Sequence, residues 1–222
     1  MTKVMVCGAS GKMGREVVKA VHNDTALTLI GGIDPKQAGE DLGIVAGIGA
    51  LNLPVYASLE NALVKDKPDV IVDFTSPAVI FENAKTVLSA GVHMVIGTTG
   101  LTEEQRNELA AIGKEHHANC LVAPNFSLGA VMMMKVSAEL APYFPNVEII
   151  ELHHNHKYDA PSGTSILTAK LINEAKASAG AIADEDLTRE SLPGARGAKV
   201  DDVTIHSVRL PGYVAHQQVL FG

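Results

Sequence analysis

One short segment, residues 151–164, gathers side chains that can move protons and bind anions: ELHHNHKYDAPSGT. Its histidines titrate near neutral pH and can act as general acids or bases, while Lys157 is a fixed cation. Ser162-Gly163-Thr164 has the form of a helix start, where backbone N–H groups attract a carboxylate. These residues predict a catalytic loop that also binds an anion.

The same histidines have two other interpretations, a metal site and a cluster without function. In a strand, His153 and His154 would point to opposite faces, and no cysteine lies nearby, so the spacing does not favour a metal ion. We therefore expect no metal and keep the catalytic loop as the working hypothesis.

A second centre of chemistry lies near the N-terminus, where Gly8-x-x-Gly11-x-x-Gly14 follows an apolar run and precedes a helical pattern. Glycines in this context let backbone N–H groups approach a pyrophosphate, and the helix N-terminus adds partial positive charge. Asp34 ends the next apolar run, 20 positions beyond Gly14, where a carboxylate can accept from a ribose hydroxyl. Context and spacing together predict a dinucleotide site, whereas the glycines alone would indicate only tight turns.

The charges around this site bear on the choice of dinucleotide. Asp34 disfavours the 2′-phosphate of NADP by like-charge repulsion, but Lys12 and Lys36 could attract it. The residues favour NADH and leave NADPH open.

Three further loops of small or polar residues follow predicted strands, at 73–77, 97–100 and 123–126. In an open parallel sheet, ligands bind beyond the carboxyl ends of the strands, which is where these loops fall. Each loop alone could be an ordinary turn, but together they extend the predicted nucleotide site.

The elements that must position the glycine loop are alternating apolar runs and helical patterns in residues 1–126. Strands that are apolar throughout indicate a parallel sheet covered on both faces, a Rossmann-like doubly wound α/β domain. Helices are expected to start at Ser76-Pro77, with serine as the cap, and at Thr102, in a capping box with Gln105. The expected strands are 3–7, 27–33, 69–74, 92–96 and 120–123.

Residues 127–222 are predicted to form a second, α+β domain for substrate binding and oligomerisation. Pro211-Gly212 separates two strand patterns by a short turn, which predicts an antiparallel pair with an open sheet face. An apolar strand directly before Gly222 suggests that C-terminal residues are missing. The Met132–Met134 run is typical of helix packing. The expected elements are helices at 129–140 and 162–177 and strands at 147–153, 203–210 and 213–221.

Composition excludes several classes of function. A net charge of −7 leaves no general electrostatic grip on nucleic acid or anionic lipid, and 46% hydrophobic residues can bury a core. We find no signal peptide and no apolar stretch of membrane-spanning length. Cys7 and Cys120 lie in apolar runs, so we expect them to be reduced. These features predict a soluble, cytoplasmic protein without nucleic-acid or membrane partners.

The motifs CGASGKMGRE, DFTSP, GTTG, APNFS, ELHHNHKYDAPSGT and IHSVRLPGYVAHQQVLFG resemble those of the dihydrodipicolinate reductase (4-hydroxy-tetrahydrodipicolinate reductase) family over essentially the whole chain. The resemblance implies that His153 and Lys157 are catalytic, His153 as a proton donor or acceptor and Lys157 as a proton donor. The residues implied in substrate binding are His154, Ser162, Gly163 and Thr164. The residues implied in cofactor binding are Gly8, Ala9, Ser10, Gly11, Lys12, Met13, Asp34, Gly97, Thr98, Thr99, Ala123, Pro124, Asn125 and Phe126.

The resemblance also implies a reaction, hydride transfer from NADH or NADPH to a cyclic dicarboxylate imine. The product would be tetrahydrodipicolinate, for diaminopimelate and lysine biosynthesis, and the enzyme a homotetramer whose chain continues past Gly222. Family members usually carry a basic residue where Pro35 stands, so the cofactor preference stays open.

Two alternatives are a non-catalytic dinucleotide-sensing protein and a semialdehyde dehydrogenase. Turnover of the cyclic substrate would separate a sensor from a reductase. A semialdehyde dehydrogenase would need a cysteine nucleophile in the second domain, and residues 127–222 contain no cysteine.

Overall fold

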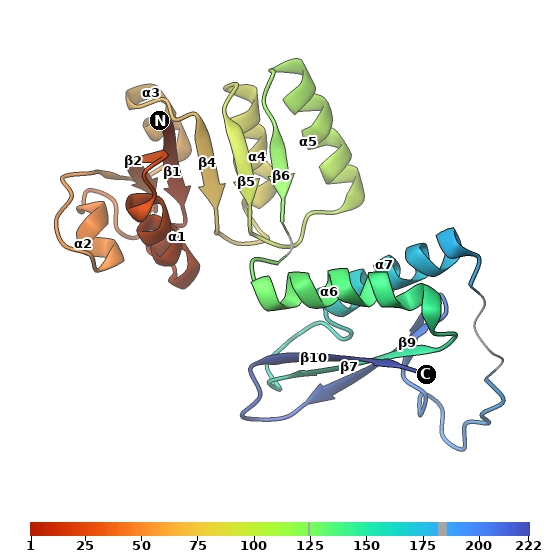
Figure 1. The fold of residues 1–222 in the computed structure, drawn as a ribbon. Helices are drawn as coiled ribbons and strands as arrows, with labels where there is room; N and C mark the ends of the chain where they lie inside the picture. The colour runs from red at the N-terminus through yellow and green to blue at the C-terminus, as the bar shows by residue number, and fades with distance from the viewer. Residues whose placement is uncertain (124, 182–185) are drawn as a thin grey trace. The chain divides into compact units, whose positions relative to one another are not determined.

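The computed structural model describes residues 1–123, 125–181 and 186–222. The chain divides into two compact units, Met1–Pro124 and Asn125–Gly222, and each is described by itself (Figure 1). Each unit buries its own hydrophobic residues, as expected for domains with separate cores.

The first unit contains a six-stranded sheet in the order β3-β2-β1-β4-β5-β6, and every neighbouring pair is parallel. Its strands are β1 (Thr2–Cys7), β2 (Leu27–Ile33), β3 (Val55–Tyr56), β4 (Val70–Asp73), β5 (His93–Ile96) and β6 (Cys120–Val122). The chain runs outward from β1 to β3 and then returns to β4 on the other side of β1. Such a reversal opens a ligand crevice at the carboxyl ends of the strands, and it confirms the predicted doubly wound fold.

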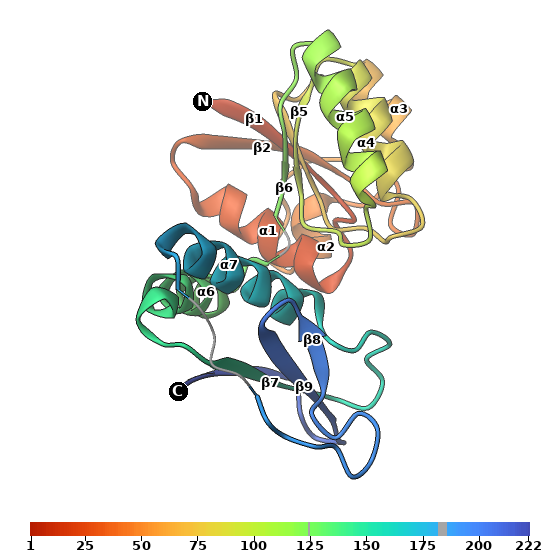
Figure 2. The same ribbon diagram turned by 90° about the vertical axis from the view of Figure 1, so that its right-hand side faces the viewer.

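Helices cover both faces of this sheet (Figure 2). On one face lie α1 (Lys12–Asn23) and α2 (Leu42–Ala46), and on the other lie α3 (Leu59–Lys65), α4 (Ile80–Ser89) and α5 (Glu103–Glu115). Successive residues of β1 pack on opposite sides: Val6 belongs to the core with Val18 of α1, whereas Met5 belongs to the core with Leu88 of α4. The strand is therefore apolar without alternation because both of its faces are buried.

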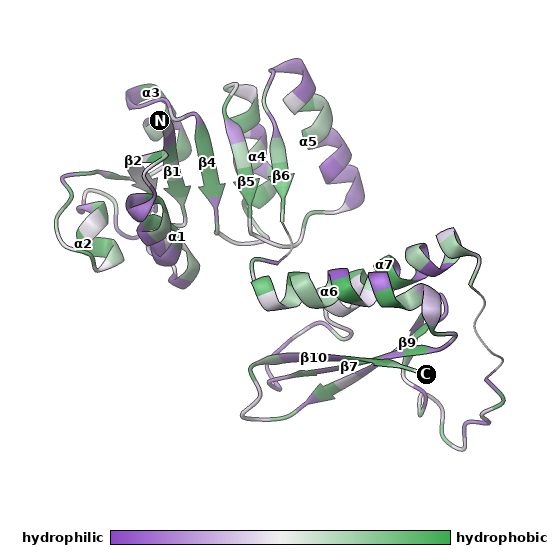
Figure 3. Cartoon of the chain, in the orientation of Figure 1, coloured by the Kyte–Doolittle hydropathy of each residue, from purple (hydrophilic) through white to green (hydrophobic). Residues whose placement is uncertain are grey.

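Hydropathy follows the same layering (Figure 3). The strands of the first sheet are hydrophobic along most of their length, while α1 and α5 carry many hydrophilic residues. In α1 only Gly14, Val18 and Val21 are buried, at the spacing of one helix face.

The helix after β4 begins later than the sequence predicts. The predicted start at Ser76-Pro77 is wrong, because residues 77–79 form a turn and α4 begins at Ile80. The Ser76 carbonyl accepts hydrogen bonds from the N–H groups of Val79 and Ile80, each at 3.1 Å. Ser76 therefore anchors the helix start through its backbone rather than as a side-chain cap.

The capping box of α5 is confirmed. Thr102 Oγ1 accepts from the Gln105 N–H at 3.2 Å, and Gln105 Oε1 accepts from the Thr102 N–H at 2.9 Å. The sequence missed α2, β3 and α3, because elements this short show little periodicity.

The second unit contains a four-stranded mixed sheet in the order β10-β7-β9-β8. Its strands are β7 (Val147–His153), β8 (Ala198–Val200), β9 (Val203–Arg209) and β10 (Ala215–Phe221), and its helices are α6 (Leu128–Leu140), the 3-10 turn η1 (Ala141–Tyr143) and α7 (Gly163–Ala179). Ile172 of α7 packs in one core with Ile149 and Ile205 of the sheet. The sequence missed β8, and residues 182–185 lie outside the described residues.

The predicted antiparallel pairing of the last two strands is wrong. β7 lies between them, antiparallel to β10 along its whole length and parallel to β9. After β9 the chain passes the end of β7 and returns along its other edge. A hairpin would have left one edge of β7 unpaired, although this strand carries the core residues Val147 and Ile149.

The sheet of the second unit has two different faces. Strand alternation places Ile150, Leu152, Val208 and Leu220 on the face opposite the core residues Ile149 and Ile205. Leu220 is 48% exposed, and the other three are half-buried. This face therefore presents apolar side chains between polar ones.

Two findings concern the whole chain. Among the described residues, no helix is both long and apolar enough to span a membrane. Cys7 and Cys120 are both free thiols, as the sequence predicts.

Candidate functional site

The glycine loop joins β1 to α1 in the first unit. Gly8 has a φ of +77°, a conformation that favours glycine. A Cβ atom on Gly14 would lie 2.0 Å from the Gly8 carbonyl oxygen, so the loop touches the first turn of the helix. Gly11 caps α1 without a side-chain hydrogen bond, which leaves N–H groups of the first turn for a ligand. The arrangement is a cradle that requires glycine.

Asp34, at the end of β2, is held against this cradle by Ser10. Its Oδ2 atom accepts from the Ser10 N–H at 3.0 Å and from the Ser10 hydroxyl at 2.5 Å, and Oδ1 accepts from the Lys36 N–H at 3.0 Å. Burial raises the pKa of Asp34, but the hydrogen bonds from Ser10 and Lys36 outweigh it, so the pKa lies below its usual value. The carboxylate is ionised at neutral pH and accepts hydrogen bonds only.

A cavity of about 550 Å³ opens beside the glycine loop. Among the predicted cofactor residues, Gly8, Ser10, Gly11 and Asp34 line it, and Lys36 joins them. The structure therefore brings the glycine cradle and the acidic strand end to one cavity.

The other predicted residues of this loop lie around the cavity. Ala9 is buried in the core below the loop, whereas Lys12 and Met13 begin α1 and are exposed. Sequence reasoning missed Arg15, whose Nε donates to the Ser10 carbonyl at 2.9 Å. Arg15 adds a cation beside the glycine loop, and only its place in the quoted motif could have pointed to it.

A buried carboxylate joins the loops after β4 and β5. Asp73 is fully buried and accepts from Thr98 Oγ1 at 2.7 Å, Thr75 Oγ1 at 2.7 Å and Asn83 Nδ2 at 3.1 Å. The Thr75 N–H also donates to Thr98 Oγ1 at 2.8 Å. The predicted convergence of these two loops rests on this network.

The remaining residues of these loops differ in exposure. A Cβ on Gly97 would lie 2.3 Å from the Phe74 ring, so a larger residue would displace that ring. Thr99 is exposed, whereas Thr98 is buried. The loop thus presents Thr99 and the Gly97 backbone, while Thr98 holds the fold.

The third predicted loop falls at the boundary of the two units. The Ala123 N–H donates to the Ile96 carbonyl at 2.9 Å, which continues the β5–β6 pairing. Pro124 lies outside the described residues. Asn125 and Phe126 belong to the second unit, where Asn125 Nδ2 donates to Thr164 Oγ1 at 3.3 Å.

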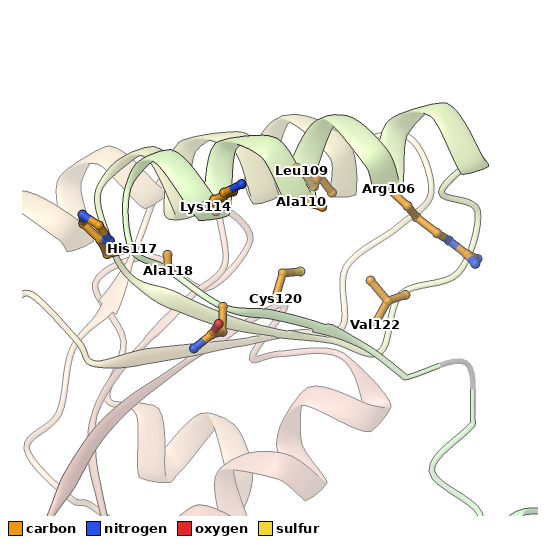
Figure 4. A pocket seen from close by; sticks show the side chains of 10 residues that line it. Arg106, Leu109, Ala110, Lys114, His117, Ala118, Cys120 and Val122 are labelled. Atoms are coloured by element: carbon orange, nitrogen blue, oxygen red, sulfur yellow. The ribbon is translucent and has the colours of Figure 1, made fainter.

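A separate cavity of about 750 Å³ lies between α5 and β6 (Figure 4). Leu109, Cys120 and Val122 line it together with the basic residues Arg106 and Lys114. Burial raises the pKa of the Cys120 thiol, so this sulfur stays protonated. The predicted cofactor residues are absent from its described lining, so we do not assign it to the nucleotide site.

The second unit has its own polar cavity, of about 560 Å³. The predicted residues His153, Ser162 and Thr164 line it, and Asn125 joins them. Ser162 caps α7, since its hydroxyl accepts from the Ser165 N–H at 3.3 Å, so the first turn of the helix begins at this cavity. The arrangement can bind an anion beside an imidazole.

The other predicted residues of this segment, His154, Lys157 and Gly163, are not among the described residues that line the cavity. Lys157 Nζ pairs with Asp159 Oδ1 at 2.6 Å. His154 Nδ1 accepts from the His156 N–H at 3.2 Å, and Gly163 begins α7. The histidine and the helix start therefore meet in one cavity, while the lysine is held by its neighbour.

Sequence reasoning missed Gln217 of β10, which also lines this cavity. Ser165 Oγ donates to Gln217 Oε1 at 2.7 Å, and Gln217 Nε2 donates to Thr168 Oγ1 at 2.9 Å. These bonds fix β10 against the first turns of α7. The motif HQQVLFG contains Gln217, but no local pattern showed that it faces α7.

The described residues also bear on metal binding. Within residues 1–123, 125–181 and 186–222, no three His, Cys, Asp or Glu side chains form a group that could hold a metal ion.

Comparisons with known proteins match the whole chain to one family. The model of "Dihydrodipicolinate reductase, N-terminus" matches residues 2–126, and that of "Dihydrodipicolinate reductase, C-terminus" matches residues 129–222. The 4-hydroxy-tetrahydrodipicolinate reductase of Listeria welshimeri is 46% identical over 220 residues, which cover 99% of this chain and 83% of the relative. The enzyme of that name from Rippkaea orientalis is 47% identical over 228 residues, covering 99% of this chain and 82% of the relative.

Solved structures give the same result. A dipicolinate-bound dihydrodipicolinate reductase from Paenisporosarcina sp. TG-14 has 43% sequence identity and a TM-score of 0.77, covering 100% of this chain and 83% of that one. GenD2 of gentamicin A biosynthesis, in complex with NAD, has 18% identity and a TM-score of 0.60 over 78% of this chain and 53% of its own, and it shows the shared fold alone. The chain therefore belongs to the dihydrodipicolinate reductase family.

Proposed function

We propose that this protein is a 4-hydroxy-tetrahydrodipicolinate reductase, an oxidoreductase that uses a reduced nicotinamide dinucleotide. The observation that carries the proposal is that His153 and the first turn of α7 line one cavity, in a chain whose relatives of 45–47% identity bear this name. Residues 1–126 act as the dinucleotide-binding domain and residues 127–222 as the domain for substrate binding and oligomerisation.

The first unit fits the dinucleotide. The cradle of Gly8, Gly11 and Gly14 leaves no room for a Cβ at Gly14 and offers N–H groups to a pyrophosphate. When bound, the reduced nicotinamide supplies the hydride. Asp34 accepts from a ribose hydroxyl, which favours NADH, and Lys36 beside it keeps NADPH possible as a second cofactor.

The loops after β4, β5 and β6 complete this site. The Gly97 backbone and Thr99 contact the cofactor from the end of β5, and the buried Asp73 network holds Thr98 in place below them. From the sequence resemblance alone, we also assign Ala123, Pro124, Asn125 and Phe126 to cofactor binding.

The second unit binds a cyclic dicarboxylate. A substrate carboxylate would bind at the start of α7, where the N–H groups of Gly163 and Thr164 can donate and the hydroxyls of Ser162 and Thr164 can add polar contacts. His154 contributes to the same binding. The dipicolinate bound by the Paenisporosarcina relative is an anion of this class.

His153 and Lys157 deliver the proton. Hydride addition to an imine leaves electron density that a nearby acid must neutralise, and an imidazolium or ammonium can do so. Lys157 Nζ contacts the Asp159 carboxylate, and the effect of burial on the pKa of Asp159 is outweighed by hydrogen bonds from Lys157 and from backbone N–H groups, which bring this pKa below its usual value. An anionic substrate competes with Asp159 for the ammonium.

The proposal also includes the pathway, the cellular compartment and the oligomeric state. The product serves diaminopimelate and lysine biosynthesis, and the enzyme works in the cytoplasm without nucleic-acid or membrane partners. The apolar face of the second sheet, with Ile150, Leu152, Val208 and Leu220, supports a homotetramer in which a partner subunit covers it.

A coupled assay tests the function. Freshly prepared substrate with NADH or NADPH should give steady oxidation of the nicotinamide, and dipicolinate should inhibit in competition with the substrate. A protein that binds NADH but oxidises none in the presence of substrate would be a dinucleotide sensor instead. Whether the hydroxylated or the dehydrated imine is reduced follows from comparing fresh and aged substrate.

A further inference from the structure

A buried ion pair lies next to His153 in the second unit. Glu151 of β7 is fully buried, and its two carboxylate oxygens accept from Arg209 Nη2 at 2.7 Å and Arg209 Nη1 at 2.8 Å. Oε1 also accepts from the Ser162 N–H at 3.3 Å, and Oε2 is hydrogen-bonded to Nδ1 of His153. Neither Glu151 nor Arg209 belongs to the predicted site, although both lie in the quoted motifs.

The charge state of Glu151 determines which ring nitrogen of His153 carries the hydrogen. Burial raises the pKa of Glu151, but hydrogen bonds from Arg209, Ser207 and His153 outweigh it and bring the pKa below its usual value. An ionised carboxylate only accepts hydrogen bonds, so Nδ1 of His153 must carry the hydrogen. Nε2 is then the nitrogen that loses and regains a proton.

Arg209 reaches beyond this carboxylate. Its Nη2 atom also donates to the Asp159 carbonyl at 2.8 Å, and the Asp159 carboxylate holds Lys157 Nζ at 2.6 Å. The guanidinium of Arg209 thus holds both the Glu151 carboxylate, which contacts His153, and the loop that carries Lys157. A planar fork of this kind suits two such directed contacts better than a lysine would.

We propose that Glu151 and Arg209 are positioning residues, which fix His153 with its hydrogen on Nδ1 and tie the loop of Lys157 to β9. Neither residue has to touch the substrate. The proposal rests on the proposed function, because His153 is taken as a proton donor to the substrate.

Other charged groups surround His153 and enter any pH dependence. Arg209 comes from β9, and Lys157 with Asp159 comes from the loop before α7. His216 of β10 also lines the cavity, next to the Ala215–His153 pair of the sheet. The residues of α6 and α7 that line it have no titratable side chain: Gly129, Ala130, Met133 and Thr164.

The test compares two glutamates of the same strand. Glu151→Gln keeps the shape of the side chain but removes the carboxylate charge beside Nδ1 of His153, so kcat should fall roughly 10- to 100-fold. The pH profile of kcat should change as well, because the imidazole loses its anionic partner. KM and NADH affinity should change little. Glu148→Gln, on the opposite face of β7, should leave kcat and its pH profile unchanged.

A second measurement reads the imidazole in the unmutated protein and uses a variant only to assign its signal. Nitrogen NMR of the full chain labelled at histidine, with the His153 signal assigned by its loss in His153→Gln, should show Nδ1–H in the neutral ring. A ring that carries its hydrogen on Nε2 would overturn the proposal, as would a pH profile left unmoved by Glu151→Gln. If the unmutated protein oxidises no NADH with substrate, the proposed function fails, while the nitrogen signal still decides the positioning role.

Discussion

Ser10 and Asp34 are joined by two hydrogen bonds to the same carboxylate oxygen, at 2.5 Å from the hydroxyl and 3.0 Å from the N–H. The glycine loop thereby fixes the orientation of the acidic group at the end of β2. Oδ1 receives the Lys36 N–H at 3.0 Å and keeps a lone pair for a ribose hydroxyl. The cofactor preference therefore depends on a carboxylate that the loop itself holds in place.

The first prediction follows from this pair. Asp34→Ala should weaken NADH binding roughly 10- to 100-fold, the worth of a hydrogen bond to a charged group, and should spare NADPH. Ser10→Ala is the matched control, because it removes the hydroxyl bond but leaves the carboxylate, so NADH should still be preferred. Calorimetric titration of both cofactors gives the answer, and a large NADPH preference in the unmutated protein would refute this role of Asp34.

The second prediction concerns the closest contact of the glycine loop. A Cβ on Gly14 would lie 2.0 Å from the Gly8 carbonyl oxygen, so Gly14→Ala should displace the loop. We expect a loss of about 1–3 kcal/mol in unfolding free energy and a clear loss of NADH affinity. Gly129→Ala serves as the control, since its Cβ would meet only Ser127 Oγ at 3.9 Å. Denaturant unfolding measures the stability, and NADH titration measures the affinity. If Gly14→Ala and Gly129→Ala had the same stability and the same NADH affinity, the role of Gly14 in the cradle would be refuted.

The sequence predicts a secondary-structure element correctly where the signal lies within a few neighbouring residues. The bounds of β2 follow from an apolar run that stops before Asp34, and the capping box at Thr102 follows from the spacing of two side chains. The order of the last strands depends instead on which edge of β7 each one pairs with. That choice is made by packing across the whole unit, which a short turn at Pro211-Gly212 does not reveal.

The third prediction uses pH. The Arg196 hydrogen bond lowers the pKa of Glu148, burial opposes it, and His206 adds to the lowering. A depressed folded-state pKa contributes stability above the unfolded value of about 4.3, and this contribution is lost as pH falls through the folded value. Glu148→Gln should therefore be less stable than the unmutated protein at pH 7, by about 1 kcal/mol or less because the pair is partly exposed.

Urea unfolding at neutral pH and again below the folded pKa of Glu148 checks this sign. The difference between the two proteins should shrink at the lower pH. A difference that stays constant would show that the lost stability is not the charge of Glu148.

The fourth prediction concerns assembly. If a partner subunit covers the sheet face of Ile150, Leu152 and Leu220, light scattering should report a tetramer of the 23.3 kDa chain. Leu152→Glu should shift it toward smaller species, whereas Val64→Glu, at a residue 86% exposed in α3, should not. A monomer at micromolar concentration would contradict the proposed interface.

The candidate site shows the same limit of sequence reasoning. His153 and Ser162 were predicted because both lie in one continuous motif, and both line the cavity. Gln217 and Arg209 lie 52 and 58 residues from the partners they bind, Ser165 and Glu151. Only the pairing of β7 with β9 and β10 brings these side chains together, so no spacing in the sequence could indicate their roles.

The fifth prediction tests the central claim, that the second unit delivers the proton in a nicotinamide-dependent reduction. His153→Ala and Lys157→Ala should each lower kcat by roughly 10²- to 10⁴-fold, while Thr164→Val and His154→Ala should raise KM more than they lower kcat. NADH affinity should stay nearly constant in all four variants, because none of these residues is among those assigned to cofactor binding.

The most direct measurement is the kcat of His153→Ala and Lys157→Ala with saturating NADH and substrate. The account predicts a large drop in kcat for both variants with NADH affinity retained. Near-normal kcat in both would contradict it, and the segment would then act only as an anion-binding clamp.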